Sequence, residues 1–137
     1  MNDLILIIED NDDDVLVIER GFKKGKIANP LKRFVNGKEA LDFMESIQNK
    51  SIELILLDLN MEVMNGFDFL KIRKESEKLS KIPVVILTSS HRDEDIELAY
   101  SLGANAYVEK PIDPKEFIKI IMTIEEFWIV LAKKPLL

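Results

Sequence analysis

The feature that most constrains the fold is a set of short apolar runs that each end in a polar or charged residue. Residues 54–57 (Leu-Ile-Leu-Leu) lead directly into Asp58, and residues 4–8 (Leu-Ile-Leu-Ile-Ile) lead into Glu9 and Asp10. Uninterrupted apolar runs of this length are typical of strands covered on both faces, as in parallel sheets. Ligands of open parallel sheets bind beyond the carboxyl ends of the strands. Asp58 is therefore expected at the carboxyl end of a strand, where a site forms.

Amphipathic segments alternate with the apolar runs along the chain. We expect strands over residues 4–8, 31–35, 54–57, 83–87 and 106–109. We expect helices over about residues 12–24, from Gly37 to a break at 49–51, from Phe67 into the polar run 73–81, over about 93–102, and from Pro114 to about Leu131. This alternation with right-handed crossovers predicts an α/β protein with a doubly wound, five-stranded parallel sheet and five helices. Residues 1–137 are expected to form a single domain that ends in a short tail.

Composition excludes several classes of function. The formal charge of −6 is a poor match for a phosphate backbone, so direct nucleic-acid binding is not expected. The chain has no cysteine, which excludes disulfides and thiolate chemistry and fits a reducing compartment. It has neither an apolar run of the roughly 20 residues that span a membrane nor the features of a signal peptide. We therefore expect a cytoplasmic protein without a membrane partner.

Polar side chains follow four of the five expected strands. They are Glu9 and Asp10 after the first strand, Asp58 and Asn60 after the third, Thr88 after the fourth and Lys110 after the fifth. Converging carboxylates repel one another unless a cation lies among them, and hard oxygen ligands suit Mg²⁺. A hydroxyl and an ammonium beside the metal suit an anion, so the set matches phosphoryl transfer to a carboxylate, with Asp58 as nucleophile. Each residue alone also fits an ordinary role as a helix cap, turn residue or surface charge.

The order and spacing of these motifs resemble the receiver domain of two-component response regulators over residues 1 to about 128. The matching motifs are Glu9-Asp10-Asn11, Leu57-Asp58-Leu59-Asn60 with Gly66 after it, Leu87-Thr88-Ser89, Gly103-Ala104 and Lys110-Pro111. The resemblance implies a flavodoxin-like sheet with strand order 2-1-3-4-5. It also implies a signalling protein rather than an enzyme. Asp58 would accept a phosphoryl group from a histidine kinase or a histidine phosphotransfer protein.

The resemblance implies a ligand set for Mg²⁺. Asp10, Asp58 and the backbone carbonyl of Asn60 would bind the ion directly, and Glu9 would act through a metal-bound water. The chain departs from the family in having Glu9 where an aspartate is common and Glu62 where a proline is common. Neither departure changes the residue that would be phosphorylated.

The resemblance also implies a set of phosphoryl-binding and switch residues. They are Thr88, Ser89, Tyr107, Lys110 and Pro111. Lys110 would pair with Asp58 and then with the phosphoryl oxygens, while Thr88 and the backbone after it would bind the phosphoryl group. Tyr107 matches the rotameric switch aromatic of the family. The Lys110–Pro111 peptide bond is expected to be cis.

A narrower likeness is to single-domain regulators that partner bacterial phytochrome kinases. It rests on residues 9–15, 33–37 and 124–128. It implies a bacteriophytochrome-type histidine kinase as the partner and no output domain after residue 137.

The last expected helix has more apolar positions than one buried stripe needs. We expect one face to lie on the sheet: Phe117, Ile120, Ile121, Ile124, Trp128 and Leu131. The remaining apolar residues form a candidate homodimer face: Ile118, Met122, Ile129 and Phe127. The signal would reach it through the fourth helix, the fifth strand and the last helix. The alternative is a broad core contact that the tail at 133–137 covers.

Three other interpretations fit parts of the pattern. A phosphatase of the haloacid dehalogenase type needs a second aspartate two residues after the nucleophile, and Asn60 stands there. A flavodoxin-like cofactor binder needs a loop after the first strand that holds phosphate, and the acids at 9–14 would repel it. A receiver-like interaction module would need no phosphorylation, and the intact set of site residues argues against it.

Overall fold

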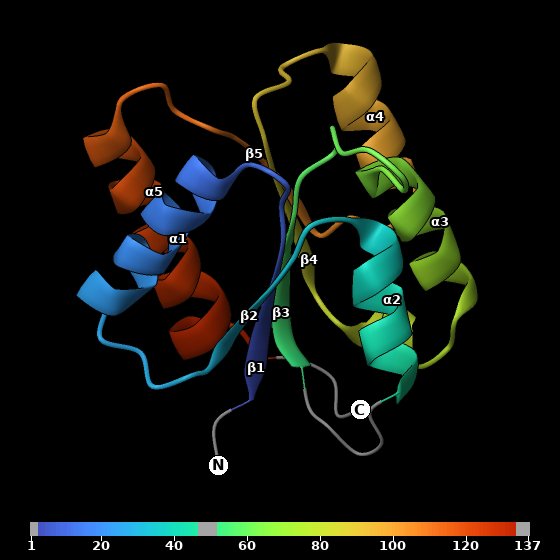
Figure 1. The fold of residues 1–137 in the computed structure, drawn as a ribbon, viewed down its shortest axis with the longest axis horizontal. Coiled ribbons are helices and arrows are strands. Elements are labelled where there is room, and N and C mark those ends of the chain that lie inside the picture. The colour runs from blue at the N-terminus through green and yellow to red at the C-terminus, as the bar shows by residue number, and fades with distance from the viewer. Residues whose placement is uncertain (1–2, 47–51, 134–137) are drawn as a thin grey trace.

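The computed structural model describes residues 3–46 and 52–133, which form one parallel sheet with helices on both faces (Figure 1). The strands are β1 (Leu4–Ile8), β2 (Leu31–Phe34), β3 (Ile52–Leu57), β4 (Val84–Thr88) and β5 (Ala106–Glu109). They are parallel and lie in the order β2-β1-β3-β4-β5. The predicted fold class and strand order are therefore confirmed.

Helices alternate with the strands, as expected. They are α1 (Asp12–Lys24), α2 (Gly37–Ser46), α3 (Gly66–Glu75), α4 (Asp93–Ser101) and α5 (Pro114–Glu125), together with a short 3₁₀ turn, η1 (Leu79–Lys81), and a π-helical turn, η2 (Glu126–Leu131). The predicted end of the second helix at 49–51 and the tail at 134–137 lie outside the described residues. Within the described ranges, no helix combines the length and apolarity needed to cross a bilayer.

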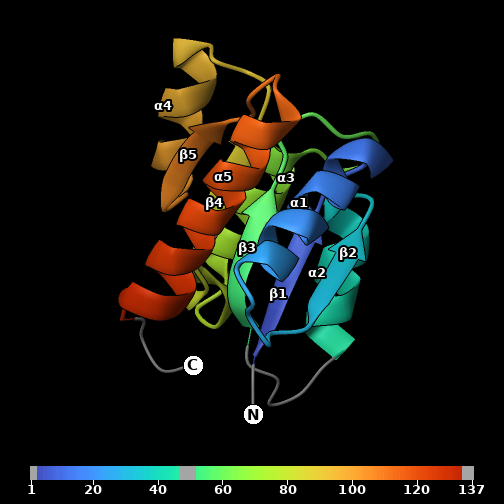
Figure 2. The ribbon, with the colours of Figure 1, turned by 90° about the vertical axis from the view of Figure 1, so that its left-hand side faces the viewer.

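The two faces of the sheet carry separate cores. Helices α1 and α5 cover one face, and α2, α3 and α4 cover the other (Figures 1 and 2). Successive residues of a strand point to opposite faces, so each strand contributes to both cores. The α1/α5 core includes Ile5, Ile7, Leu54, Leu56, Val85 and Leu87. The opposite core includes Leu6, Ile8, Ile55, Leu57, Val84 and Ile86. Burial on both faces explains why these strands read as continuous apolar runs.

The close packing of α1 on α5 depends on a glycine. A Cβ atom at Gly21 would lie 2.5 Å from Cβ of Ile121. Gly21 is thus a buried residue within α1 that makes room for α5.

The π-helical turn η2 changes which side chains of the last helix face the sheet. Phe117, Ile121 and Ile124 are buried as expected, but Leu131 is 64% exposed, so its assignment to the sheet face is wrong. The backbone N–H of Ala132 donates to the carbonyl of Phe127 at 2.7 Å, an i to i+5 bond that widens the turn. Trp128 packs against the α1/α5 core as expected, and Ile129, which was expected on the candidate homodimer face, packs against it as well. The wider turn shifts the helical periodicity on which the prediction for Leu131 relied.

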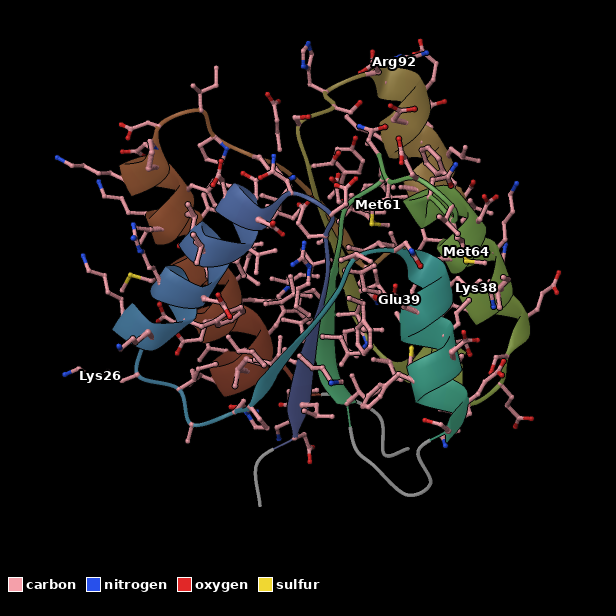
Figure 3. All side chains as sticks on the ribbon, in the orientation of Figure 1. Lys26, Lys38, Glu39, Met61, Met64 and Arg92 are labelled. Atoms are coloured by element: carbon pink, nitrogen blue, oxygen red, sulfur yellow. The ribbon has the colours of Figure 1, made fainter. Side chains whose placement is uncertain are left out.

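The loop between β3 and α3 contains a residue with strained backbone. Val63 has a φ of 71°, and the N–H of Met64 donates to the carbonyl of Glu62 at 2.9 Å. The three residues form a γ-turn with a positive central φ, which is rare and strained, most of all for a β-branched residue. Figure 3 shows Met61 at the carboxyl end of the sheet and Met64 near the start of α2, where the Gly37 N–H donates to the Met64 carbonyl at 3.2 Å. The loop is held on both sides of the strained residue, since Met61 is buried in the core and Met64 is bonded to Gly37.

We expect Val63→Gly to raise the free energy of unfolding by about 1 kcal/mol. Glycine adopts a positive φ without strain, and the Val63 side chain is 80% exposed, so little packing is lost. The measurement is urea denaturation of the two proteins. Glu62→Gly, at the neighbouring exposed position, is the control and should not stabilise the protein. A Val63→Gly protein no more stable than wild type would contradict the strain argument.

Candidate functional site

The carboxyl ends of the parallel strands lie at the upper end of the sheet in Figure 1. Residues that follow β1, β3, β4 and β5 line one pocket there. The pocket has a volume of about 440 Å³. Its polar lining includes Asp10, Asp14, Asp58, Asn60, Ser89 and Lys110. The structure thus brings together side chains that are up to about a hundred residues apart in sequence, as the strand-end argument predicted.

Three carboxylates lie close together at this pocket, and two of them, Asp10 and Asp58, line it. Glu9, Asp10 and Asp58 each offer an oxygen within 4.8 Å of the others. Glu9 and Asp58 are buried, whereas Asp10 is exposed. Burial and the nearby Asp58 carboxylate raise the pKa of Glu9 to about 8, although Lys110 opposes the shift. This dense set of hard oxygen donors has the chemistry that a divalent cation requires.

Asp58 is held by backbone contacts at the end of β3. Its Oδ1 accepts a hydrogen bond from the N–H of Leu59 at 2.7 Å, and its own N–H donates to the carbonyl of Ile8 at 3.0 Å. Helix α3 begins against this turn, because the N–H of Gly66 donates to the carbonyl of Leu59 at 3.1 Å. A Cβ atom at Gly66 would collide with the carbonyl oxygen of Asp58. Glycine is therefore required for this close approach, and Asp58 Oδ2 is left to face the pocket.

Lys110 reaches three carboxylates at once. Its Nζ lies 2.5 Å from Glu9 Oε1, 2.8 Å from Asp14 Oδ2 and 3.3 Å from Asp58 Oδ2. Burial alone lowers the pKa of the ammonium, but the hydrogen bonds to Asp14 and Glu9 outweigh burial and raise the pKa above its ordinary value. The pairing of Lys110 with Asp58 was expected from the family resemblance, whereas the contact with Asp14 was missed. Asp14 lies four residues before the buried Ile18, a spacing that places it on the inward face of α1.

The peptide bond between Lys110 and Pro111 is trans, since the described residues contain no cis peptide bond. The expected cis geometry is therefore wrong. The trans form is the lower-energy isomer before proline. Lys110 enters the site in this geometry, with its backbone N–H donating to the carbonyl of Thr88 at 2.7 Å.

The end of β4 carries a buried hydroxyl without a hydrogen-bond partner. Thr88 is fully buried, and its Oγ1 contacts no hydrogen-bonding group among the described residues. An unpaired buried hydroxyl is costly, so this position is suited to an incoming acceptor. The next residue, Ser89, is exposed. Tyr107 donates from its hydroxyl to the carbonyl of Ser90 at 3.0 Å, which ties β5 to the loop after β4.

Arg33 has a structural role that the sequence did not reveal. Its Nε donates to the carbonyl of Glu9 at 2.8 Å, and its Nη2 pairs with Asp12 at 2.7 Å. The guanidinium thereby ties the end of β2 to the turn between β1 and α1.

The profile of the response regulator receiver domain matches residues 5–122. The chain therefore belongs to the response regulator receiver domain family of two-component signalling. Divalent-cation binding is general to this family, in agreement with the acidic cluster of the pocket.

Several relatives cover nearly the whole chain. Response regulator Rcp1 from Synechocystis sp. is 32% identical over 136 residues, which are 96% of this chain and 92% of that protein. The structure of its Mn²⁺-bound form has a TM-score of 0.89 over 98% of this chain and 99% of that one. The structure of the phosphorylated cyanobacterial phytochrome response regulator RcpA has a TM-score of 0.92 at 31% identity, over 99% of this chain and 100% of that one. The probable methanogenesis regulatory protein FilR2 from Methanothrix harundinacea is 33% identical over 135 residues, which are 96% of this chain and 87% of that protein. The expected likeness to the receiver family and to phytochrome response regulators is confirmed.

Proposed function

We propose that this chain is the phosphoacceptor of a two-component system and that Asp58 receives the phosphoryl group from a histidine kinase in the presence of Mg²⁺. The observation that carries the proposal is the position of Asp58 Oδ2. It faces the pocket between the Glu9–Asp10 carboxylates and the ammonium of Lys110, 3.3 Å away. A buried carboxylate flanked by a cation and by a candidate cation site is a nucleophile suited to an anionic phosphoryl donor.

The residues at the pocket fit Mg²⁺. The oxygens of Glu9, Asp10 and Asp58 lie close enough for one ion to contact all three groups, and the exposed Asp10 leaves room for the waters that Mg²⁺ retains. We assign Asp10, Asp58 and the carbonyl of Asn60 as ligands and Glu9 as a ligand through water. A bound Mg²⁺ would neutralise charge as the phosphoryl group arrives.

Each of the residues around the pocket has its own role in the phosphoryl transfer. An Asp58 Oδ forms the bond to phosphorus as the bond from phosphorus to the imidazole nitrogen of the donor breaks. Lys110 neutralises charge on the phosphoryl oxygens. The unpaired hydroxyl of Thr88 donates to one of these oxygens, and the backbone at Ser89 provides a second donor. The transfer leaves an acyl phosphate on Asp58 and a neutral histidine on the partner.

The loop after β4 links this event to the surface. If Thr88 moves toward the phosphoryl group, the neighbouring Ser90 moves with it. The hydroxyl of Tyr107 donates to the carbonyl of Ser90, so Tyr107 must follow or lose its partner. We therefore propose Tyr107 as the switch residue that relays phosphorylation to α4, β5 and α5.

The proposed upstream partner is a histidine kinase of the phytochrome type, supported by the likeness to the phytochrome response regulator RcpA. A homodimer through Ile118, Met122, Phe127 and Ile129 stays a prediction. Phe127 is 51% exposed, which suits an interface. Ile118 and Met122 are half-buried, and Ile129 packs partly on the core. Any such interface therefore centres on the exposed end of the last helix.

The test is intact mass spectrometry after incubation with a small phosphodonor, with Mg²⁺ or with a chelator. We expect one added phosphoryl group that requires Mg²⁺. Light scattering on the same samples reports whether phosphorylation changes the assembly. Absence of added mass with Mg²⁺ present, in a protein that binds no metal, would contradict the proposal and favour an interaction module.

A further inference from the structure

Helix α1 begins with three consecutive acids that have different surroundings. Asp12 is 83% exposed at its side chain and pairs with Arg33, and Asp13 is exposed. Asp14 is only 25% exposed and contacts Lys110 at 2.8 Å. The helical period explains the difference, because Asp14 shares the inward face with Ile18 one turn later. Asp14 is thus the one acid of the three that enters the pocket.

The ammonium of Lys110 is shared between two kinds of carboxylate. Glu9 and Asp58 belong to the acidic cluster that fits a metal ion, whereas Asp14 does not. A divalent cation in that cluster would attract Glu9 and Asp58 and repel the ammonium. Asp14 is the carboxylate contact of Lys110 that metal binding would leave in place.

We propose that Asp14 is a positioning residue that holds Lys110 so that the ammonium does not compete with the metal for Glu9 and Asp58. The inference rests on the proposed function of the site. Asp14 acts through Lys110 and touches neither the metal nor the phosphoryl group. When the metal binds, Lys110 keeps one charged partner and stays beside Asp58, where the phosphoryl oxygens arrive. Without Asp14, the ammonium pairs only with Glu9 and Asp58, which are the two carboxylates that the metal needs.

The experiment is Mn²⁺ titration followed by the electron paramagnetic resonance signal of the free ion, with Mg²⁺ affinity measured by competition. We expect Asp14→Asn to weaken binding of both ions about three- to tenfold. Asp13→Asn is the matched control, since it removes the same charge from the adjacent exposed position, and we expect a change below about twofold. Asp14→Glu, which retains the charge, should remain within about twofold of wild type.

The second arm separates positioning from simple loss of charge. In a Lys110→Met background there is no ammonium to hold, so Asp14→Asn and Asp13→Asn should change Mn²⁺ affinity equally. Equal affinities of the two single variants in the presence of Lys110 would overturn the proposal. A loss for Asp14→Asn that persists in full in the Lys110→Met background would overturn it as well. Absence of Mn²⁺ binding by the wild-type protein would instead remove the metal site on which the proposed function depends.

Discussion

The Asp58→Asn protein is expected to gain no phosphoryl group under conditions in which the wild type gains one. An amide lacks the nucleophilic oxygen of the carboxylate, so the rate of acceptance should fall at least about a hundredfold. The fold should persist, because the amide oxygen can still accept the hydrogen bond from the Leu59 N–H that Oδ1 accepts now. Loss of one carboxylate also relieves the repulsion that Asp58 exerts on Glu9. We therefore expect the free energy of unfolding to stay within about 1 kcal/mol of the wild type.

The measurement is intact mass after incubation with a phosphodonor and Mg²⁺, with urea denaturation of the same preparations. Asp13→Asn is the control, since it removes an exposed acid of equal charge and should be phosphorylated normally. An Asp58→Asn protein that still carries an acyl phosphate would show that another residue is the acceptor. A protein that has lost its cooperative unfolding would show instead that Asp58 is structural.

Arg73→Met is expected to lower the free energy of unfolding by about 3–5 kcal/mol, which is a large part of the total free energy of unfolding of a domain of this size. Arg73 is 3% exposed. Its guanidinium donates to the carbonyls of Ile82, Ser80 and Gly103 at 2.7–3.2 Å and to Asn105 Oδ1 at 3.3 Å. These contacts join α3 to the segment before β4 and to the turn before β5. Methionine fills the space but leaves the carbonyls without donors, which carries the full desolvation penalty.

Two further variants test this explanation by urea denaturation. Arg73→Lys keeps the charge, but a compact ammonium cannot span acceptors on three segments, so we expect a loss of at least about 2 kcal/mol. Lys74→Ala is the control, because Lys74 is exposed and its ammonium donates to the carbonyl of Ser101 at 3.0 Å. Its expected loss is below about 0.5 kcal/mol. Equal losses for Arg73→Met and Lys74→Ala would contradict the bridging role.

Arg73 and Arg33 show where sequence reasoning failed. Arg73 opens the polar run 73–81 at the end of the third expected helix, and nothing in that pattern predicts burial, yet Arg73 is among the buried side chains. Its partners are backbone carbonyls, and a carbonyl leaves no trace in residue identity. Arg33 likewise bonds the carbonyl of Glu9. A charged residue whose partners are backbone atoms looks the same in sequence as a solvated one.

The candidate site could be predicted more fully than the contacts of these two arginines. The apolar runs locate the strands. Because the strands are parallel, the residues that follow them lie at one end of the sheet. Glu9, Asp10, Asp58 and Lys110 meet there for that reason. Their roles in metal binding and phosphorylation stay predictions that the experiments above test.

The sequence by itself determined the alternation of strands and helices and the side chains at the strand ends, because both depend on local periodicity and on the direction of parallel strands. The tertiary structure alone decided how these side chains share their charges. Lys110 meets Asp14 across 96 positions of the chain, and no local pattern encodes a contact of that separation. It also decided that Leu131 faces outward and Ile129 inward, since a π-helical turn breaks the 3.6-residue period from which faces are read. Local periodicity places a residue on an element, whereas the packing of elements decides what that residue touches.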